Sequence, residues 1–178
     1  MKLNITLDDF FTLFLSDDAP VSLESHHRAV GDSNVKSTQW ETTYIDGFFA
    51  KKRNLTYKHS IKIPLAMAPP HGVATKTQTM HRFGSHGIYL DTETWINDVP
   101  LADCFYVADR LVVATHPEGG ISLTLQFGNC FVKRTMFKKI INAASVKTVF
   151  KFHKDYIDSI GRVVNSSLRS SFGRSVQS

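Results

Sequence analysis

A long apolar stripe near the C-terminal end constrains the fold of this chain more than any other feature. Within residues 135–164, apolar residues recur at spacings of three and four, which is the pattern of one face of an α-helix. No proline interrupts the run, and Gly161 comes only near its end. The stripe consists of Val146, Val149, Phe150, His153, Tyr156, Ile157, Ile160, Val163 and Val164. A stripe of this length needs an equally long partner surface to cover it.

The upstream sequence predicts a curved antiparallel sheet as that partner surface. Alternating segments rich in β-branched and aromatic residues are separated by turn residues, which is typical of strands. Thr6 is a good N-cap for a short helix, and residues 20–30 favour another helical turn or two. The predicted class is α+β, with a sheet gripping the long C-terminal helix and a large, elongated and mainly apolar ligand cavity between them. About six strands are predicted, over residues 35–43, 48–61, 73–83, 88–96, 104–115 and 121–132.

Length and composition indicate one globular domain. The chain has 178 residues, with 42% hydrophobic and 21% charged residues, which is ordinary for a protein with a buried core. We expect a domain over residues 1–165 and a disordered tail over residues 166–178, where serines accumulate. No apolar run approaches the ~20 residues that cross a bilayer, and the N-terminus does not have the pattern of a signal peptide. Two cysteines, Cys104 and Cys130, suggest a reducing compartment and free thiols.

The net charge of +5 is concentrated near the C-terminus. From Lys133 onward there are ten Lys or Arg residues against two acidic ones, Asp155 and Asp158. A basic helix face can contact anionic lipid, whereas the simpler interpretation is a solvated face. The residues predicted to face a membrane are Lys147, Lys151 and Lys154.

Residues 63–70 break the strand pattern. Their three prolines disfavour a central strand or a helix, yet the segment is too apolar for an ordinary surface loop. We expect this loop to cover a ligand or to enter lipid, as a lid, with packing on the rim of the sheet as the alternative. The predicted lid consists of Ile63, Pro64, Leu65, Ala66, Met67, Ala68, Pro69 and Pro70.

Asp109 is the main polar candidate for the cavity. It shares one side of a predicted strand with apolar residues, so it could orient a ligand hydroxyl, or it could lie at a bulge or a rim. His153 lies on the apolar helix face, either as a core histidine or as a donor that lines the cavity. The residues predicted to line the cavity are Tyr57, Phe105, Val107, Asp109, Leu123, Leu125, Phe127, Val149, His153, Tyr156 and Ile157.

Motifs for metal, nucleotide or nucleophilic chemistry do not appear in the sequence. The eight histidines have no metal-ligand spacing, and neither cysteine belongs to a C-x-x-C pair. There is no P-loop, no G-x-G-x-x-G and no G-x-S-x-G. We therefore expect no metal, no cofactor and no catalytic residue.

Three stretches together resemble the VASt domains, the StAR-related sterol-transfer domains of the Aster and Lam proteins. The first comprises Tyr57, Pro64, Leu65, Thr77, Gln78, Thr79 and Met80; the second comprises Asp98, Val99, Pro100, Asp103, Phe105 and Tyr106. The third is the opening Leu7, Phe10, Phe11, Leu13 and Phe14, and Trp40 stands where the family often has a tryptophan. The chain departs from the family pattern at Lys76, where an acid is common, and in a longer lid ending Pro69, Pro70, His71.

The resemblance implies a helix-grip, StART-like fold that holds a sterol under a mobile lid. It implies a non-enzymatic carrier that moves this cargo between membranes. If the chain is part of a longer anchored protein, the resemblance implies a location on the cytosolic face at endoplasmic reticulum contact sites. The GRAM domain and anchor of that family do not appear in this sequence, so we expect an excised domain or a reduced member. The expected partners are a sterol-like lipid and, transiently, anionic membranes, with no nucleic acid and with the chain a monomer.

Two other classes of function remain open at this point. Helix-grip folds also host cyclases and dehydratases, and a fold does not determine function. Such an enzyme would need an acid–base pair in the cavity, for instance Asp109 with Tyr57 or His153. The other class is a membrane-tethering, lipid-sensing module that uses the basic helix face without cargo.

Overall fold

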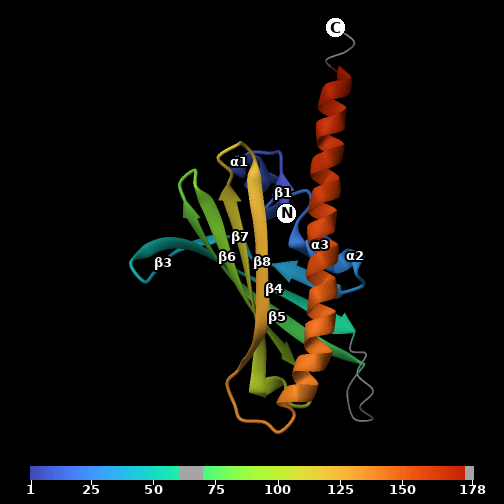
Figure 1. Ribbon diagram of the computed structural model, residues 1–178. Helices are drawn as coiled ribbons and strands as arrows, with labels where there is room; N and C mark the ends of the chain where they lie inside the picture. Colours follow the sequence, from blue (N-terminus) through green and yellow to red (C-terminus); the bar gives the residue numbers. More distant parts are fainter. Residues whose placement is uncertain (61–69, 175–178) are drawn as a thin grey trace.

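The computed structural model describes residues 1–60 and 70–174, with side chains described up to Ser166. An eight-stranded antiparallel sheet curves around one face of a long C-terminal helix, α3 (Lys138–Arg174) (Figure 1). The strand order is β1-β8-β7-β6-β5-β4-β2, and β3 pairs with β4 beside β2. The predicted helix-grip fold is therefore confirmed.

The strand boundaries agree closely with the sequence predictions. The strands are β1 (Lys2–Leu3), β2 (Ser33–Ser37), β3 (Glu41–Ile45), β4 (Phe48–Ser60), β5 (His71–Phe83), β6 (Gly87–Asn97), β7 (Phe105–Thr115) and β8 (Ile121–Phe131). The single strand predicted over residues 35–43 is instead two strands. Trp40 separates them, because its backbone amide donates to Asp17 Oδ1 at 3.0 Å and its indole Nε1 donates to the Leu15 carbonyl at 2.6 Å.

Short N-terminal helices close one end of the sheet. The capping box of α1 (Leu7–Phe10) has Asp9 N donating to Thr6 Oγ1 at 3.0 Å, so the predicted N-cap is confirmed. A π-helical segment, η1 (Phe11–Leu15), continues α1. Phe10 and Phe14 are fully buried there, with ring centroids 5.1 Å apart. This aromatic pair anchors the core at the end of the sheet where the C-terminus of α3 also lies (Figure 1).

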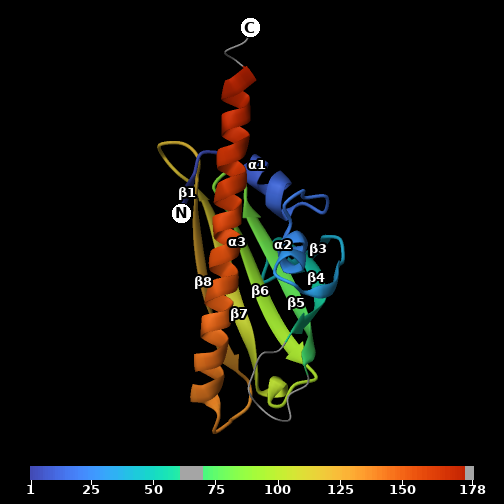
Figure 2. The ribbon, with the colours of Figure 1, turned by 90° about the vertical axis from the view of Figure 1, so that its right-hand side faces the viewer.

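Helix α2 (Leu23–Ala29) lies beside α3 and joins it to the sheet (Figure 2). The His26 ring packs on Phe152 and Tyr156 of α3, with centroid distances of 4.8 Å and 5.1 Å. The 3-10 helix η2 (Ala102–Cys104) connects β6 and β7 at the other end of the molecule. Cys104 and Cys130 are free thiols as predicted, and the strand register places Cys130 opposite Tyr106.

The apolar stripe of α3 is covered along only part of its length. Its second half is buried at Tyr156, Ile160 and Val164, whereas Val146 and Phe150 in the first half are 44% and 58% exposed. The helix also continues to Arg174, so the helical part of the chain is longer than the sequence predicted. The assignment of residues 166–178 to a tail outside the domain stays a prediction.

Candidate functional site

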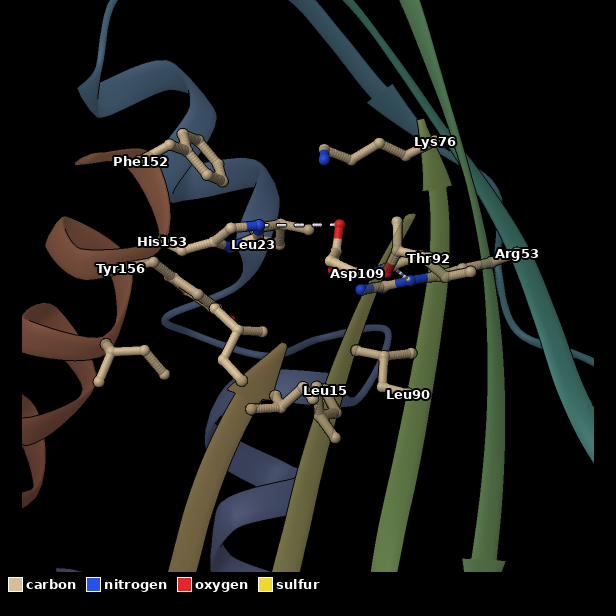
Figure 3. Close-up of a pocket in the computed structure, with 14 residues that line it drawn as sticks. Leu15, Leu23, Arg53, Lys76, Leu90, Thr92, Asp109, Phe152, His153 and Tyr156 are labelled. Atoms are coloured by element: carbon tan, nitrogen blue, oxygen red, sulfur yellow. Dashed lines mark hydrogen bonds and ion pairs between the residues drawn. The ribbon is translucent and has the colours of Figure 1, made fainter. Parts of the chain in front are cut away.

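A cavity lies between the concave face of the sheet and α3. The sheet supplies residues from β4 to β8, the N-terminal helices supply two leucines, and α3 closes the other side (Figure 3). The lining residues are Leu15, Leu23, Arg53, Lys76, Gln78, Leu90, Thr92, Asp109, Leu111, Leu125, Phe152, His153, Tyr156 and Ile157. The cavity is therefore apolar at several leucines and strongly polar at its centre.

Lys76 reaches the cavity from the middle of β5. Side chains alternate along a strand, and Lys76 shares the inward face with Ala74, Gln78 and Met80. Its ammonium group donates a hydrogen bond to Thr94 Oγ1 on β6 at 2.9 Å and lies 5.6 Å from the Phe152 ring centroid. A protonated lysine has three donors. The described residues provide one hydrogen-bond acceptor to Lys76, so donors remain for a ligand.

Asp109 points into the same space from β7. Thr92 lies opposite it in the strand register and donates a hydrogen bond to the carboxylate. The other carboxylate oxygen, Oδ2, is buried and has no hydrogen-bond partner among the described residues. On α3, His153 Nε2 lies 3.8 Å from this oxygen, beyond hydrogen-bond distance. Figure 3 shows Asp109, Lys76 and His153 converging on one point of the cavity.

Burial shifts the titration of all three groups toward their neutral forms. Burial raises the pKa of Asp109, although the positive charge of Lys76 partly opposes this. Burial lowers the pKa of Lys76, and the negative charge of Asp109 partly opposes that shift. Burial, with the positive charge of Lys76, lowers the pKa of His153 to about 3, so this imidazole is neutral at pH 7.

A buried ion pair supports the wall of the cavity at β4. Arg53 Nη1 lies 3.3 Å from Glu24 Oε1 of α2, and Arg53 Nε donates to Gln78 Oε1 at 2.8 Å. The guanidinium group also stacks on Trp40, 4.3 Å from its ring centroid. Burial raises the pKa of Glu24, but Arg53 and the hydrogen bond from Ser37 outweigh it and hold that pKa below its usual value. Arg53 therefore fixes α2 against the sheet.

A second buried polar cluster holds the end of α2. Asp32 accepts hydrogen bonds from His27 Nδ1 at 2.6 Å and His59 Nδ1 at 2.7 Å. Burial opposes ionisation of Asp32, but these two donors lower its pKa to about 2. Burial lowers the pKa of His27 to about 4. The His27 ring packs on Tyr57 with a centroid distance of 4.0 Å, so this cluster fixes Tyr57 behind the cavity.

The volume of the cavity is much smaller than the sequence predicts. The volume inside the cavity that the centre of a water molecule can occupy is about 30 Å³. Sites for drug-sized ligands measure roughly 300–1,000 Å³. The expectation of a large, mainly apolar pocket is therefore not met in this conformation. The physical reason is that Arg53, Lys76 and Gln78 extend into the space between sheet and helix.

Five of the predicted lining residues do line the cavity: Asp109, Leu125, His153, Tyr156 and Ile157. Phe127 lies beside them, its ring centroid 5.6 Å from that of His153. The others lie outside the lining, with Tyr57, Val107 and Leu123 buried, Val149 half-buried, and Phe105 stacked on Phe131 at 5.6 Å.

Sequence reasoning missed Lys76, Arg53 and Gln78. The alternation of side chains along the strands was the available signal. Lys76 and Gln78 fall between Ala74 and Met80 on the inward face of β5, and Arg53 shares the inward face of β4 with Leu55 and Tyr57. Charged and amide side chains usually lie on the surface, so the residue types gave no sign of burial.

Residues 63–69 of the predicted lid lie outside the described residues, and Pro70 is exposed. The three predicted membrane-facing lysines are exposed on α3. Two of them form ion pairs along the helix, Lys151 with Asp155 at 2.5 Å and Lys154 with Asp158 at 2.6 Å. Their membrane role stays a prediction.

Within residues 1–60 and 70–174, no group of three or more His, Cys, Asp or Glu residues is arranged to hold a metal ion. Over the same ranges, no helix is both long enough and apolar enough to span a membrane.

Comparison with known proteins agrees with this architecture. Residues 1–148 match the family described as VASt, the VAD1 Analog of StAR-related lipid transfer domain. A curated relative, Protein VASCULAR ASSOCIATED DEATH 1, chloroplastic, from Arabidopsis thaliana, is 30% identical over 146 residues. The match covers 80% of this chain but 24% of the relative. The chain belongs to the VASt family of StAR-related lipid transfer domains.

Proposed function

We propose that this domain binds a sterol-type lipid between the sheet and α3 and carries it between membranes. The observation that carries the proposal concerns Asp109 Oδ2. This atom is buried, has no hydrogen-bond partner among the described residues and faces Lys76 across a cavity in a lipid-transfer fold. A buried polar atom without a partner costs free energy, so a ligand that satisfies it gains affinity. The apolar leucines around this pair suit the body of a lipid.

The polar pair suits a hydroxyl group in particular. A hydroxyl is both donor and acceptor, so it can donate to Asp109 Oδ2 while its oxygen accepts from Lys76 Nζ. The ring system of the lipid would then extend between Leu90, Leu111 and Leu125 of the sheet and Ile157 of α3. A keto group lacks the donor and would leave the carboxylate unpartnered.

Entry of such a ligand requires the helix and the sheet to separate. The free space of about 30 Å³ is far below the volume of a sterol site. The first half of α3 is the part that can move at least cost, because Val146 and Phe150 are already largely exposed. Movement there would also withdraw Phe152 from Lys76 and open the polar end of the cavity.

The expected affinity suits a carrier. A sterol has about 28 heavy atoms, and about −0.3 kcal/mol per atom gives roughly −8 kcal/mol, or micromolar affinity. A ligand held at this strength is released again on the time scale of membrane encounters. Contact with an anionic membrane surface is part of the proposal, and residence at endoplasmic reticulum contact sites stays an expectation from the family resemblance.

Native mass spectrometry with lipid extraction tests the proposal. The purified domain, incubated with mixed membrane lipids, should retain one sterol per chain, and the variant Asp109→Ala should retain less. Retention of a phospholipid in place of a sterol, or of no lipid, would contradict it.

One observation favours a second candidate, a cavity enzyme. The acid–base pair that such an enzyme needs is present in outline, with Asp109 and neutral His153 3.8 Å apart beside Lys76. Groups of this kind could move a proton at the carbon next to a bound carbonyl. Incubation with a keto-steroid in deuterated water would show deuterium incorporation that His153→Gln abolishes. Recovery of the steroid without deuterium would exclude this candidate.

A further inference from the structure

The connection between β8 and α3 exposes an unusual set of apolar side chains. Met136 is 94% exposed, Ile140 65%, Val132 54% and Phe137 46%. Large apolar residues are common on surfaces singly, but a cluster within nine consecutive residues marks an interaction site. We call this set, together with its basic neighbours, the β8–α3 surface; it comprises Val132, Arg134, Met136, Phe137, Lys138, Lys139 and Ile140.

The basic residues of this surface are available to an anionic partner. Within the described residues, Arg134 and Lys139 have no acidic group within ion-pair distance, and Lys138 lies over the Phe131 ring at 5.0 Å. The neighbouring Lys133, by contrast, pairs with Asp103. No acidic residue lies in the first turn of α3.

The lysines farther along α3 differ in this respect. Lys151 and Lys154 are each neutralised by an aspartate one turn later. Among the described residues, Lys147 and Arg162 also have no acidic group within ion-pair distance, but they stand apart along the helix. The unpaired basic residues are closest together around the beginning of α3, where Arg134, Lys138 and Lys139 fall within six residues. Anionic partners are attracted to that end.

Hydrogen bonds connect the surface to the sheet at one end of the molecule. Asn129 of β8 donates from Nδ2 to Asn142 Oδ1 at 2.7 Å and to Ser145 Oγ at 2.6 Å, which links the start of α3 to β8. The amides of Val132 and Lys133 donate to the Cys104 carbonyl, so the β6–β7 connection lies alongside. Figures 1 and 2 show this end opposite the C-terminus of α3.

We propose that the β8–α3 surface docks the domain on an anionic lipid bilayer. Met136, Phe137 and Ile140 would enter the acyl boundary while Arg134, Lys138 and Lys139 contact anionic headgroups. The combination of an apolar edge and a basic flank is the pattern of interfacial membrane binding. The inference rests on the proposed function and deepens it, because it places the bilayer beside the first half of α3, where a lipid would enter.

The second exposed aromatic cluster fits an anionic bilayer less well. Tyr44, Phe48 and Phe49 are exposed at the β3–β4 hairpin, which projects away from α3 (Figure 1). Acidic residues accompany them, with Asp46 in the turn and Glu41 opposite Lys52 in the register. This hairpin therefore serves as a control with several exposed apolar side chains and without net positive charge.

The test is flotation of the domain with vesicles of phosphatidylcholine, with and without phosphatidylserine. Each basic residue near an anionic surface contributes about fivefold in affinity, so Lys138→Gln with Lys139→Gln should weaken binding to phosphatidylserine vesicles about 25-fold. Lys151→Gln with Lys154→Gln removes the same formal charge from the paired lysines and should weaken it less than about fivefold. Equal effects of the two pairs would overturn the proposal.

A second pair of variants tests the apolar part. Met136→Ser with Ile140→Ser should abolish flotation, whereas Phe48→Ser with Phe49→Ser should leave it unchanged. Both sites are solvent-exposed, so circular dichroism should show a folded domain in each case. Retention of vesicle binding by Met136→Ser with Ile140→Ser would overturn the proposal.

Sterol delivered from cyclodextrin separates this inference from the proposed function. The Lys138→Gln with Lys139→Gln variant should bind cyclodextrin-delivered sterol normally, because the cavity is unchanged. Failure of the unmodified domain to bind that sterol would contradict the proposed function, whatever the vesicle results. Normal sterol binding with no preference for phosphatidylserine vesicles would contradict the docking surface alone.

Discussion

His153 of α3 faces Asp109 of β7 across the cavity, with 3.8 Å between Nε2 and Oδ2. The two groups are buried on opposite layers of the fold, and neither satisfies the other at this distance. A ligand atom or a water between them would complete the contact. The pair thus marks the place where sheet and helix must part for a ligand to enter.

Asp109→Asn should discriminate between sterols by their polar group. The amide keeps the shape of the carboxylate but replaces a strong acceptor, so a 3-hydroxysterol should lose about 1–2 kcal/mol of binding free energy. A 3-ketosterol donates nothing to Asp109 and should lose little. Competition titration against a fluorescent sterol measures both. Equal losses for the two sterols would show that Asp109 has only a structural role.

Lys76→Met should weaken both binding and stability. The variant leaves the buried Asp109 carboxylate without the positive charge that faces it, so the free energy of unfolding should fall. Binding of a hydroxysterol should fall about five- to thirty-fold because the donor to the ligand oxygen is lost. Lys52→Met, at an exposed position of β4, is the control and should change neither quantity. Unchanged stability in Lys76→Met would mean that the ammonium group does not compensate the charge of Asp109.

The stability of the domain should fall as the pH decreases from about 6.5 toward 4. Burial lowers the pKa of His27 to about 4 and that of His153 to about 3, while both titrate near 6.5 in the unfolded chain. The unfolded state therefore binds protons first, and this favours unfolding. With two such groups, the free energy of unfolding should fall by up to about 2.7 kcal/mol for each pH unit of acidification. Urea unfolding at a series of pH values measures it.

His153→Gln should halve the change in the free energy of unfolding per pH unit, because one of the two protons no longer binds on unfolding. Asp109 opposes the trend, since its raised pKa makes the folded state take up a proton first. Asp32, whose pKa is lowered to about 2, adds to the loss only below about pH 3.8. An unchanged slope in His153→Gln would show that His153 is protonated in the folded protein.

Removing one member of the Arg53–Glu24 pair should lower the free energy of unfolding more than replacing both members with apolar residues. Glu24→Ala leaves the guanidinium group buried without its counter-charge and should cost about 3 kcal/mol or more. Arg53→Met combined with Glu24→Leu removes both charges and should recover most of that loss. Thermal unfolding of the single and double variants measures the coupling. A double variant less stable than Glu24→Ala would show that the contacts of Arg53 with Gln78 and Trp40 dominate.

Much of the fold was predictable because its signals are local. The capping residue Thr6, the alternation of β6 and the period of α3 each arise from a few neighbouring residues. The division of β2 from β3 was not predictable in this way. It depends on hydrogen bonds from Trp40 to Leu15 and Asp17, which are far from it in the sequence.

The candidate site was predictable only in part, for the same reason. Asp109 and His153 were found because each interrupts a regular apolar face. Lys76 was missed because its burial depends on the register that sets it opposite Thr94, and on Phe152 of α3. The small volume of the cavity likewise depends on where several long side chains point, which no local pattern shows.

Photo-crosslinking with a diazirine-bearing sterol tests the central claim, that a sterol-type lipid binds between the sheet and α3, most directly. After irradiation and digestion, the label should lie on peptides of β6, β7, β8 and α3 that contain Leu90, Leu111, Leu125 and Ile157, and excess unlabelled sterol should suppress it. Labelling confined to outward-facing residues such as Thr124 or Gln126, or labelling that unlabelled sterol does not suppress, would contradict the claim.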